Sequence, residues 1–194
     1  MMARPIEFDR TKALDAAMQV FWCQGYTATS TQDLMQAMGI KPGSLYNAFR
    51  DKHTLYLEAL ERYQETVGSC VFEPLMKPNA GSEAIKQVFA DLVNQEVSDP
   101  QHRGCFMLNA TLELASHDNA VRELAEQAQK RGQNAFYAAL LNAQSIGAID
   151  QHHDLEQVAA YLVSLIYGVR SAAKARPEHT YLSQIVHVGL SILK

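Results

Sequence analysis

Residues 41–52 combine small residues, hydrogen-bonding side chains and flanking cations within one short stretch. Gly43 and Ser44 are small enough to allow close approach, and Tyr46 and Asn47 follow with groups that donate and accept hydrogen bonds. The major groove of DNA admits a single helix, and its base edges present a distinct pattern of donors and acceptors. These residue types in this order therefore predict a helix that reads DNA.

A second group of residues beside this helix could hold the DNA backbone. The first turn of a helix has unpaired amides that bind phosphate, and hydroxyl and cationic side chains make similar contacts. Arg4, in a short N-terminal arm, could enter a neighbouring minor groove. The predicted DNA contacts are Arg4, Thr29, Ser30, Thr31, Lys41, Pro42, Gly43, Ser44, Tyr46, Asn47 and Lys52.

Three short helices are expected to position these side chains, because apolar residues recur at spacings of three and four. The expected helices cover residues 8–24, about 31–38 and about 45–50. Ser30 with Asp33 fits a capping box for the second helix, and Ser44 is expected to cap the third. Tyr46 and Asn47 would then face away from the core. This arrangement is a helix-turn-helix.

In the rest of the chain apolar residues also recur at helical spacing, and no segment shows the alternation of apolar and polar residues that a strand would. Residues 73–82 contain two prolines and a glycine and predict a loop. Ser82, Asp118 and Asp154 are expected to cap later helices. The sequence predicts helices at about 51–70, from 82, at about 105–115, from 118 to about 147, at 154–175 and at 180–193.

The composition excludes several classes of protein. The chain has 194 residues and no apolar run near the roughly 18–20 needed to span a bilayer. Its N-terminus lacks the apolar region of a secretory signal, so we expect a cytoplasmic protein. Three cysteines without metal-ligand spacing predict neither a metal site nor a disulfide framework. No nucleophile elbow, paired acid motif or phosphate loop is present, so we expect no enzyme and no cofactor.

The charge distribution predicts that one copy of the N-terminal region binds DNA weakly. Residues 1–53 hold six basic and five acidic side chains, whereas the remainder holds eleven basic and sixteen acidic ones. A net charge of +1 attracts the phosphates of DNA only weakly. Two linked copies gain effective concentration and can read a palindrome, with reading helices roughly 34 Å apart in successive major grooves. We therefore expect a dimer.

Residues 9–60 resemble the DNA-binding domain of the TetR/AcrR family of bacterial transcriptional regulators. The matching segments are F-W-C-Q-G-Y-T-A-T-S-T-Q-D-L and A-M-G-I-K-P-G-S-L-Y-N-A-F-R-D-K-H-T-L. They contain the glycine, aromatic and hydroxyl residues that the family shows after its first helix, and the lysine, glycine, serine, tyrosine and phenylalanine around its third. Asn47 departs from the histidine often found at its position. This leaves the base preference open, although asparagine suits adenine.

The resemblance implies an all-α fold in which a three-helix DNA-binding domain precedes a helical ligand-binding and dimerisation domain. We place these domains at residues 1–54 and 55–194. It also implies a homodimeric repressor that binds a palindromic operator and is released by a small molecule.

The last two helices are the expected dimer interface. The stretch Y-L-V-S-L-I-Y-G-V-R-S-A-A is apolar on more than one face, so we expect burial on more than one side. Gly168, Ala172 and Ala173 would allow close approach of a second helix. A monomeric core helix is the alternative interpretation.

The C-terminal domain should also hold a pocket lined by apolar and aromatic residues. Most such residues simply form the core, so sequence order alone leaves the pocket undefined. The candidate ligand contacts are Phe89, Cys105, Phe106, Phe136, Tyr137, Tyr161 and Tyr167.

Cys105 is the one cysteine whose surroundings favour reactivity. It follows His102 and Arg103 at an expected helix start, and both cations and the helix dipole stabilise a thiolate. The segment R-G-C-F-M-L-N-A-T-L-E-L-A also resembles a TetR subgroup, some of whose members sense electrophiles through a cysteine at this place. An alternative function is therefore a redox- or electrophile-sensing repressor switched by covalent modification of Cys105. The competing interpretation is a buried thiol that only packs.

Overall fold

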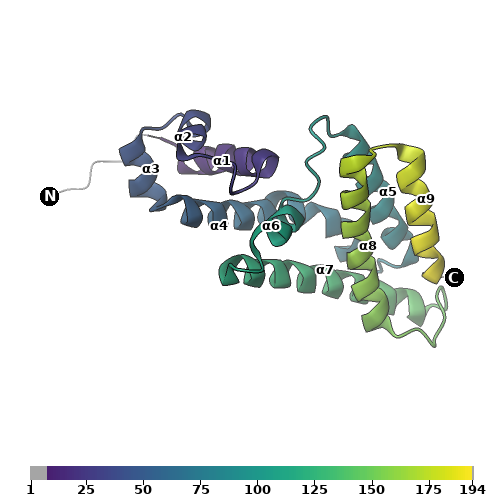
Figure 1. Cartoon of the computed structure of the whole chain (residues 1–194). Helices are drawn as coiled ribbons and strands as arrows, with labels where there is room; N and C mark the ends of the chain where they lie inside the picture. Colours follow the sequence, from purple (N-terminus) through teal and green to yellow (C-terminus); the bar gives the residue numbers. More distant parts are fainter. Residues whose placement is uncertain (1–7, 194) are drawn as a thin grey trace. The chain divides into compact units, whose positions relative to one another are not determined.

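The computed structural model describes residues 8–193, and every regular element in that part of the chain is helical (Figure 1). The N-terminal helices are α1 (Arg10–Gln24), α2 (Thr31–Met38), α3 (Pro42–Phe49) and α4 (Lys52–Tyr63). The later helices are α5 (Ser82–Ser98), α6 (Phe106–Leu114), α7 (Asn119–Ser145), α8 (Leu155–Ala175) and α9 (His179–Gly189). A π-helical turn covers Gln64–Gly68, and 3-10 turns cover Cys70–Met76 and Leu190–Leu193. The predicted all-α fold is confirmed.

The chain forms two compact units, and the first of them contains more than the N-terminal helices. This first unit comprises the chain up to Thr66 together with Phe106–Leu124, and the second unit comprises Val67–Cys105 and the chain from Ala125 onward. All of α4 lies in the first unit because Leu55, Tyr56, Ala59 and Leu60 are fully buried there. The functional boundary expected after residue 54 stays a prediction.

Aromatic rings form the centre of the first unit. The ring of Tyr56 lies 4.9 Å from Phe21 and 4.8 Å from Tyr26, measured between centroids. Phe106, the first residue of α6, meets Tyr56 edge-on at 5.5 Å and Tyr63 at 5.7 Å. Such edge-to-face pairs add to the free energy gained from burial. Helix α6 is therefore part of the core that supports α1 and α4.

Two expected helix caps are wrong, and in both cases the helix begins earlier than predicted. Lys41, in extended conformation, is the N-cap of α3, and Pro42 occupies its first position. Proline suits this position because its ring fixes a helical φ and it has no N–H to leave unpaired. Ser44 therefore lies inside α3 and does not cap it. Ser82 is likewise the first residue of α5, whose N-cap is Gly81.

The predicted loop at residues 73–82 is wrong for its first half. A 3-10 turn continues to Met76 and contains Pro74. The fixed φ of proline is compatible with a 3-10 turn, so Pro74 does not indicate a loop at its position.

The core of the second unit is formed by α5, α8, α9 and the C-terminal part of α7. The rings of Phe89 and Phe136 stack with centroids 6.0 Å apart, and both side chains are fully buried. The buried Glu96 and Arg170 form an ion pair of 3.4 Å between α5 and α8. Among the residues described, no helix combines the length and apolar character needed to cross a bilayer.

Candidate nucleic-acid interface

Helix α3 has one fully buried face and one exposed face. Leu45 and Phe49 are 0% exposed, whereas Tyr46 is 52% exposed and Asn47 is exposed as well. Gly43 is exposed at the start of the helix, and a Cβ placed on it would meet no atom within 4 Å. The orientation predicted for Tyr46 and Asn47 is confirmed. Their side chains face solvent, and Gly43 is exposed nearer the start of the same helix.

Arg10 of α1 holds the C-terminal end of α3 in place. Its guanidinium binds the carboxylate of Glu58 in α4 at 2.6 Å and donates to the carbonyl of Ala48 at 3.3 Å. The same guanidinium lies 4.4 Å from the ring centroid of Phe49, a cation–π distance. A helix of eight residues is marginal by itself, so these contacts and the buried face determine where α3 lies.

The start of α2 carries the predicted capping box. The hydroxyl of Ser30 accepts from the amide of Asp33 at 3.1 Å, and the Asp33 carboxylate accepts from the amide of Ser30 at 2.8 Å. Hydrogen bonds from Ser30 lower the pKa of Asp33 below its usual value. Thr31 is partly exposed beside them. Thr29 is buried, and its hydroxyl donates to the carbonyl of Gly25 at 2.6 Å.

The predicted cations occupy different environments. Lys41 is exposed beside Pro42, at the start of α3. Lys52 is partly buried, and its ammonium lies 4.2 Å from the ring centroid of Tyr26. Arg4 lies outside the described residues. Ser44, which lies near the N-terminus of α3, is partly buried.

Glu113 in α6 contributes to this region, although nothing in the sequence singled it out. Its two carboxylate oxygens accept from the backbone amides of Tyr26, at 2.9 Å, and Thr27, at 2.7 Å. Gly25, next to them, has φ +80°, and a Cβ there would lie 2.8 Å from the nearer oxygen. The turn between α1 and α2 is thus built around a carboxylate from a distant helix. A sequence signal was available only for the glycine, which precedes a run of hydroxyl residues.

The electrostatics of Glu113 favour its charged form. Burial acts to raise its pKa, but hydrogen bonds from the side chain and amide of Thr27 and from the amide of Tyr26 lower it overall. Asp118, just before α7, behaves similarly: burial acts to raise its pKa, and its contact with His53 contributes to lowering it. The imidazole Nε2 of His53 lies 2.7 Å from this carboxylate.

The residues predicted to contact a ligand lie in several different environments. Phe106 belongs to the aromatic core of the first unit, and Phe136 is buried and stacks against Phe89. Tyr137 and Tyr161 are 38% and 40% exposed. Cys105 is buried, and Tyr167, whose electrostatic partners include Cys105, has its pKa raised to about 12, chiefly by burial.

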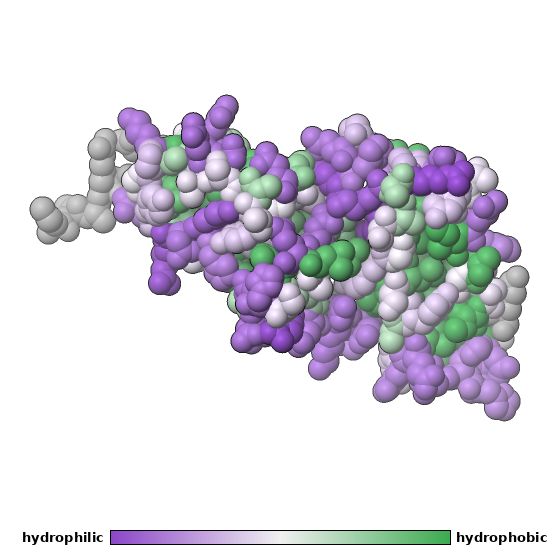
Figure 2. Space-filling model, in the orientation of Figure 1, coloured by the Kyte–Doolittle hydropathy of each residue, from purple (hydrophilic) through white to green (hydrophobic). Residues whose placement is uncertain are grey.

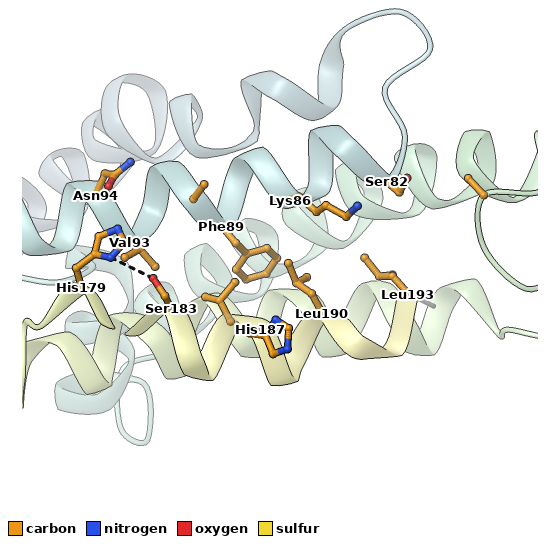
Figure 3. Close-up of a pocket in the computed structure, with 13 residues that line it drawn as sticks. Ser82, Lys86, Phe89, Val93, Asn94, His179, Ser183, His187, Leu190 and Leu193 are labelled. Atoms are coloured by element: carbon orange, nitrogen blue, oxygen red, sulfur yellow. Dashed lines mark hydrogen bonds between the residues drawn. The ribbon is translucent and has the colours of Figure 1, made fainter. Parts of the chain in front are cut away.

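The second unit contains an open groove between α5 and α9, of about 570 Å³ (Figure 3). Phe89 is the one predicted ligand contact that lines it, and in Figure 3 its ring points toward α9. Polar groups surround this apolar centre, among them a hydrogen-bonded pair, His179 and Ser183, at 3.4 Å. The lining residues are Ser82, Lys86, Phe89, Ala90, Val93, Asn94, Ala148, His179, Ser183, Val186, His187, Leu190 and Leu193.

Comparisons with known proteins agree with the geometry of α2 and α3. Residues 13–59 match the family described as bacterial regulatory proteins, tetR family, and residues 81–188 match the tetracyclin repressor-like C-terminal domain. Over 194 residues the chain is 34% identical to the HTH-type transcriptional regulator YezE of Bacillus subtilis (strain 168), covering 99% of this chain and 100% of the relative. Over 190 residues it is 30% identical to the HTH-type transcriptional repressor ComR of Escherichia coli (strain K12), covering 97% and 90%.

Solved structures share the fold. A cysteine mutant of the TetR family transcriptional regulator CifR, complexed with 26-base-pair double-strand operator DNA, matches with a TM-score of 0.86 and 30% identity, covering 98% of this chain and 100% of that chain. The reduced form of NemR from Escherichia coli matches with a TM-score of 0.84, covering 95% and 96%. Its identity of 19% makes that likeness one of fold alone.

We predict that the Glu113 contact stabilises the fold at neutral pH and that this stabilisation is lost in acid. Because its pKa is lowered in the folded state, the stabilisation is complete above the unfolded pKa of about 4.3 and is lost as the pH falls through the folded pKa. Glu113→Gln should lower the unfolding free energy by about 1 kcal/mol at pH 7, allowing for solvent screening. Urea unfolding at pH 7, 5 and 3.5 measures the difference, with Glu123→Gln as control. A difference that persists undiminished at pH 3.5 would contradict this linkage.

Proposed function

This chain belongs to the TetR family of bacterial regulatory proteins, and we propose that it is a repressor that binds a palindromic operator as a homodimer and is released by a small-molecule effector. The observation that carries the proposal is the two-sided character of α3. Its inner residues, Leu45 and Phe49, are fully buried, while Tyr46 and Asn47 project from a well-held helix into solvent. We infer a regulator that acts in the cytoplasm and not an enzyme.

In this proposal α3 enters the major groove. Tyr46 and Asn47 contact base edges, and the amide of Asn47 suits adenine, with which it can form two hydrogen bonds. The exposed Pro42 and Gly43 add little bulk at the leading end of the helix, so the backbone there approaches the DNA closely. Ser44 lies beside them.

Phosphate contacts hold the helix in register. We assign them to Lys41 and Lys52, to Ser30 and Thr31 at the start of α2, and to the amides at the starts of α2 and α3. Arg4 is proposed to reach a minor groove. Thr29 is proposed to act indirectly, because its hydroxyl is already bound to the carbonyl of Gly25.

The outer face of α8 and α9 is the proposed dimer interface. Figure 2 shows hydrophobic side chains gathered over this region of the surface. Val188 on α9 is 70% exposed and Tyr161 on α8 is 40% exposed. Gly168 on α8 is exposed, and a Cβ placed on it would meet nothing within 4 Å. A second copy of these two helices would cover the apolar residues and could approach closely at the glycine.

The proposed effector site is the groove between α5 and α9, which the fully buried Phe89 lines from below the surface. Its volume of about 570 Å³ is in the range of small-molecule sites. The other predicted contacts, Cys105, Phe136 and Tyr167 among them, stay candidates for a site that opens when a ligand binds.

Covalent switching at Cys105 is the second candidate function. The thiol is 3% exposed and directly precedes Phe106, which is packed in the aromatic core. Adding a group to a thiol in so little space would displace the start of α6. Operator affinity before and after treatment with an oxidant or an alkylating electrophile decides between the two. Loss of affinity in the native protein but not in Cys105→Ala would support switching, and equal behaviour would exclude it.

We predict that Tyr46→Ala and Lys52→Ala each weaken operator binding without unfolding the protein. Each change removes one contact per half-site, and we expect a loss of about ten-fold or more per variant because a dimer loses two contacts. Lys52→Ala should also reduce the salt dependence of binding. Leu141→Ala, which removes an exposed side chain from the second unit, is the control. Electrophoretic shift assays measure affinity, and an unchanged affinity for Tyr46→Ala would remove α3 from the interface.

We also predict that Val188→Glu converts a dimer into a monomer. Two copies of this charge would be buried against apolar surface without partners, which is costly. Light scattering after gel filtration at micromolar concentration gives the mass, expected near twice 21.6 kDa for the native chain. Ile146→Glu is the matched control, since Ile146 is 79% exposed and lies outside α8 and α9. A native monomer, or a dimeric Val188→Glu, would contradict the assigned interface.

A further inference from the structure

We propose that Glu113 is a positioning residue for operator binding: its carboxylate sets the turn between α1 and α2 and thereby the placement of the helices that follow it. This inference rests on the operator binding proposed above. It assigns to one side chain, which need not touch DNA, control over how α2 and α3 are presented.

Glu113 accepts two hydrogen bonds from backbone amides of the turn between α1 and α2. The amides of Tyr26 and Thr27 point at the two oxygens of one carboxylate, at 2.9 Å and 2.7 Å. These partners are 87 and 86 positions apart in sequence. Hydrogen bonds to a charged acceptor are the stronger kind. Leaving the partly buried amide of Tyr26 without its bond would cost free energy. The place of the turn is therefore tied to the place of α6.

The turn also packs closely against the carboxylate of Glu113. Gly25 has φ +80°, a conformation that favours glycine, and even a methyl group there would lie 2.8 Å from Glu113 Oε2. On the other side, the hydroxyl of Thr29 closes the turn on the Gly25 carbonyl at 2.6 Å. Helix α2 begins at Thr31, directly after this closed loop. A shift of the carboxylate would therefore be passed to the N-terminus of α2.

A second contact ties the exit of the helix-turn-helix to the same short segment. Asp118, five positions after Glu113, binds His53 at the start of α4 at 2.7 Å. Lys52, next to His53, lies over the ring of Tyr26 at 4.2 Å. The segment 113–118 thus contacts the chain both before α2 and after α3. Helices α2 and α3 therefore lie in the chain between two contacts, one made by α6 and one made by the loop that follows it.

Because Glu113 is charged, its positioning effect on operator affinity can be separated from its electrostatic effect. A carboxylate near a DNA-binding surface opposes the phosphates, so neutralising it should by itself strengthen binding. Weaker binding after neutralisation would then report lost positioning. Glu123, exposed on α7 in the same unit, carries the same charge and serves as the matched control.

The experiment measures operator affinity and amide exchange in the full-length native protein and in three variants: Glu113→Gln, Glu113→Asp and Glu123→Gln. The DNA is a genomic fragment selected by the native protein. We expect Glu113→Gln to bind about ten-fold more weakly, and Glu113→Asp, which keeps the charge but loses reach, to weaken as well. Glu123→Gln should bind as the native chain does or slightly more tightly. Hydrogen exchange at the amides of Tyr26 and Thr27 should accelerate in both Glu113 variants, while the α4 amides stay protected.

Native or tighter affinity in both Glu113 variants, with faster exchange at Tyr26 and Thr27, would overturn the inference while leaving operator binding intact. If the native chain selects no DNA, the proposed function fails and this inference fails with it. Exchange that accelerates throughout α4 in Glu113→Gln would indicate general loosening. In that case the Glu113→Asp result decides: retained α4 protection with weakened binding supports positioning, and unchanged binding refutes it.

Discussion

An eight-residue helix does not hold its shape in water by its own hydrogen bonds, and α3 is such a helix. Its fold and its direction must come from what it is packed against. Leu45 and Phe49 are fully buried, and Arg10 binds its C-terminal end through the carbonyl of Ala48 and the ring of Phe49. The surface proposed to read DNA therefore depends on residues of α1, α4 and α6 that face inward. This explains why the first unit includes α6 as well as the N-terminal helices.

The same dependence explains how the polar residues of the first unit are used. Thr29 closes a turn, Ser30 and Asp33 cap α2, and Asp51 accepts from the amide of Thr54 at the start of α4. These groups satisfy the backbone and are only partly available to DNA. Few side chains remain for direct contact, and the N-terminal region carries little net positive charge. Two copies acting together offset this small number of contacts, so the proposed dimer follows from the chemistry of one copy.

Sequence reasoning succeeded for most features that a single local signal determines. Apolar periodicity located the helices, and Ser30 with Asp33 and Asp154 marked helix starts that the structure confirms. It failed where two local signals competed: Ser44 is a good capping residue, but Pro42 begins the helix earlier. It missed most of all the contacts between residues that are far apart in the sequence. Glu113 meets a turn more than eighty positions away, and the aromatic residues expected to form one pocket lie in separate environments. The packing of the helices determines the Glu113 contact and the places of these aromatic residues. The spacing of residues in the sequence does not reveal that packing.

The most direct test of the central claim, that paired copies of α3 read bases, is selection of genomic DNA fragments by the purified native protein and by Asn47→Ala. We expect the native protein to enrich palindromic sites whose half-sites are separated by about one helical turn or a multiple of it. The variant should enrich the same palindrome with the base preference lost at one symmetric position in each half-site. Enrichment of unrelated fragments without a palindrome, or an identical base preference in the variant, would contradict the claim.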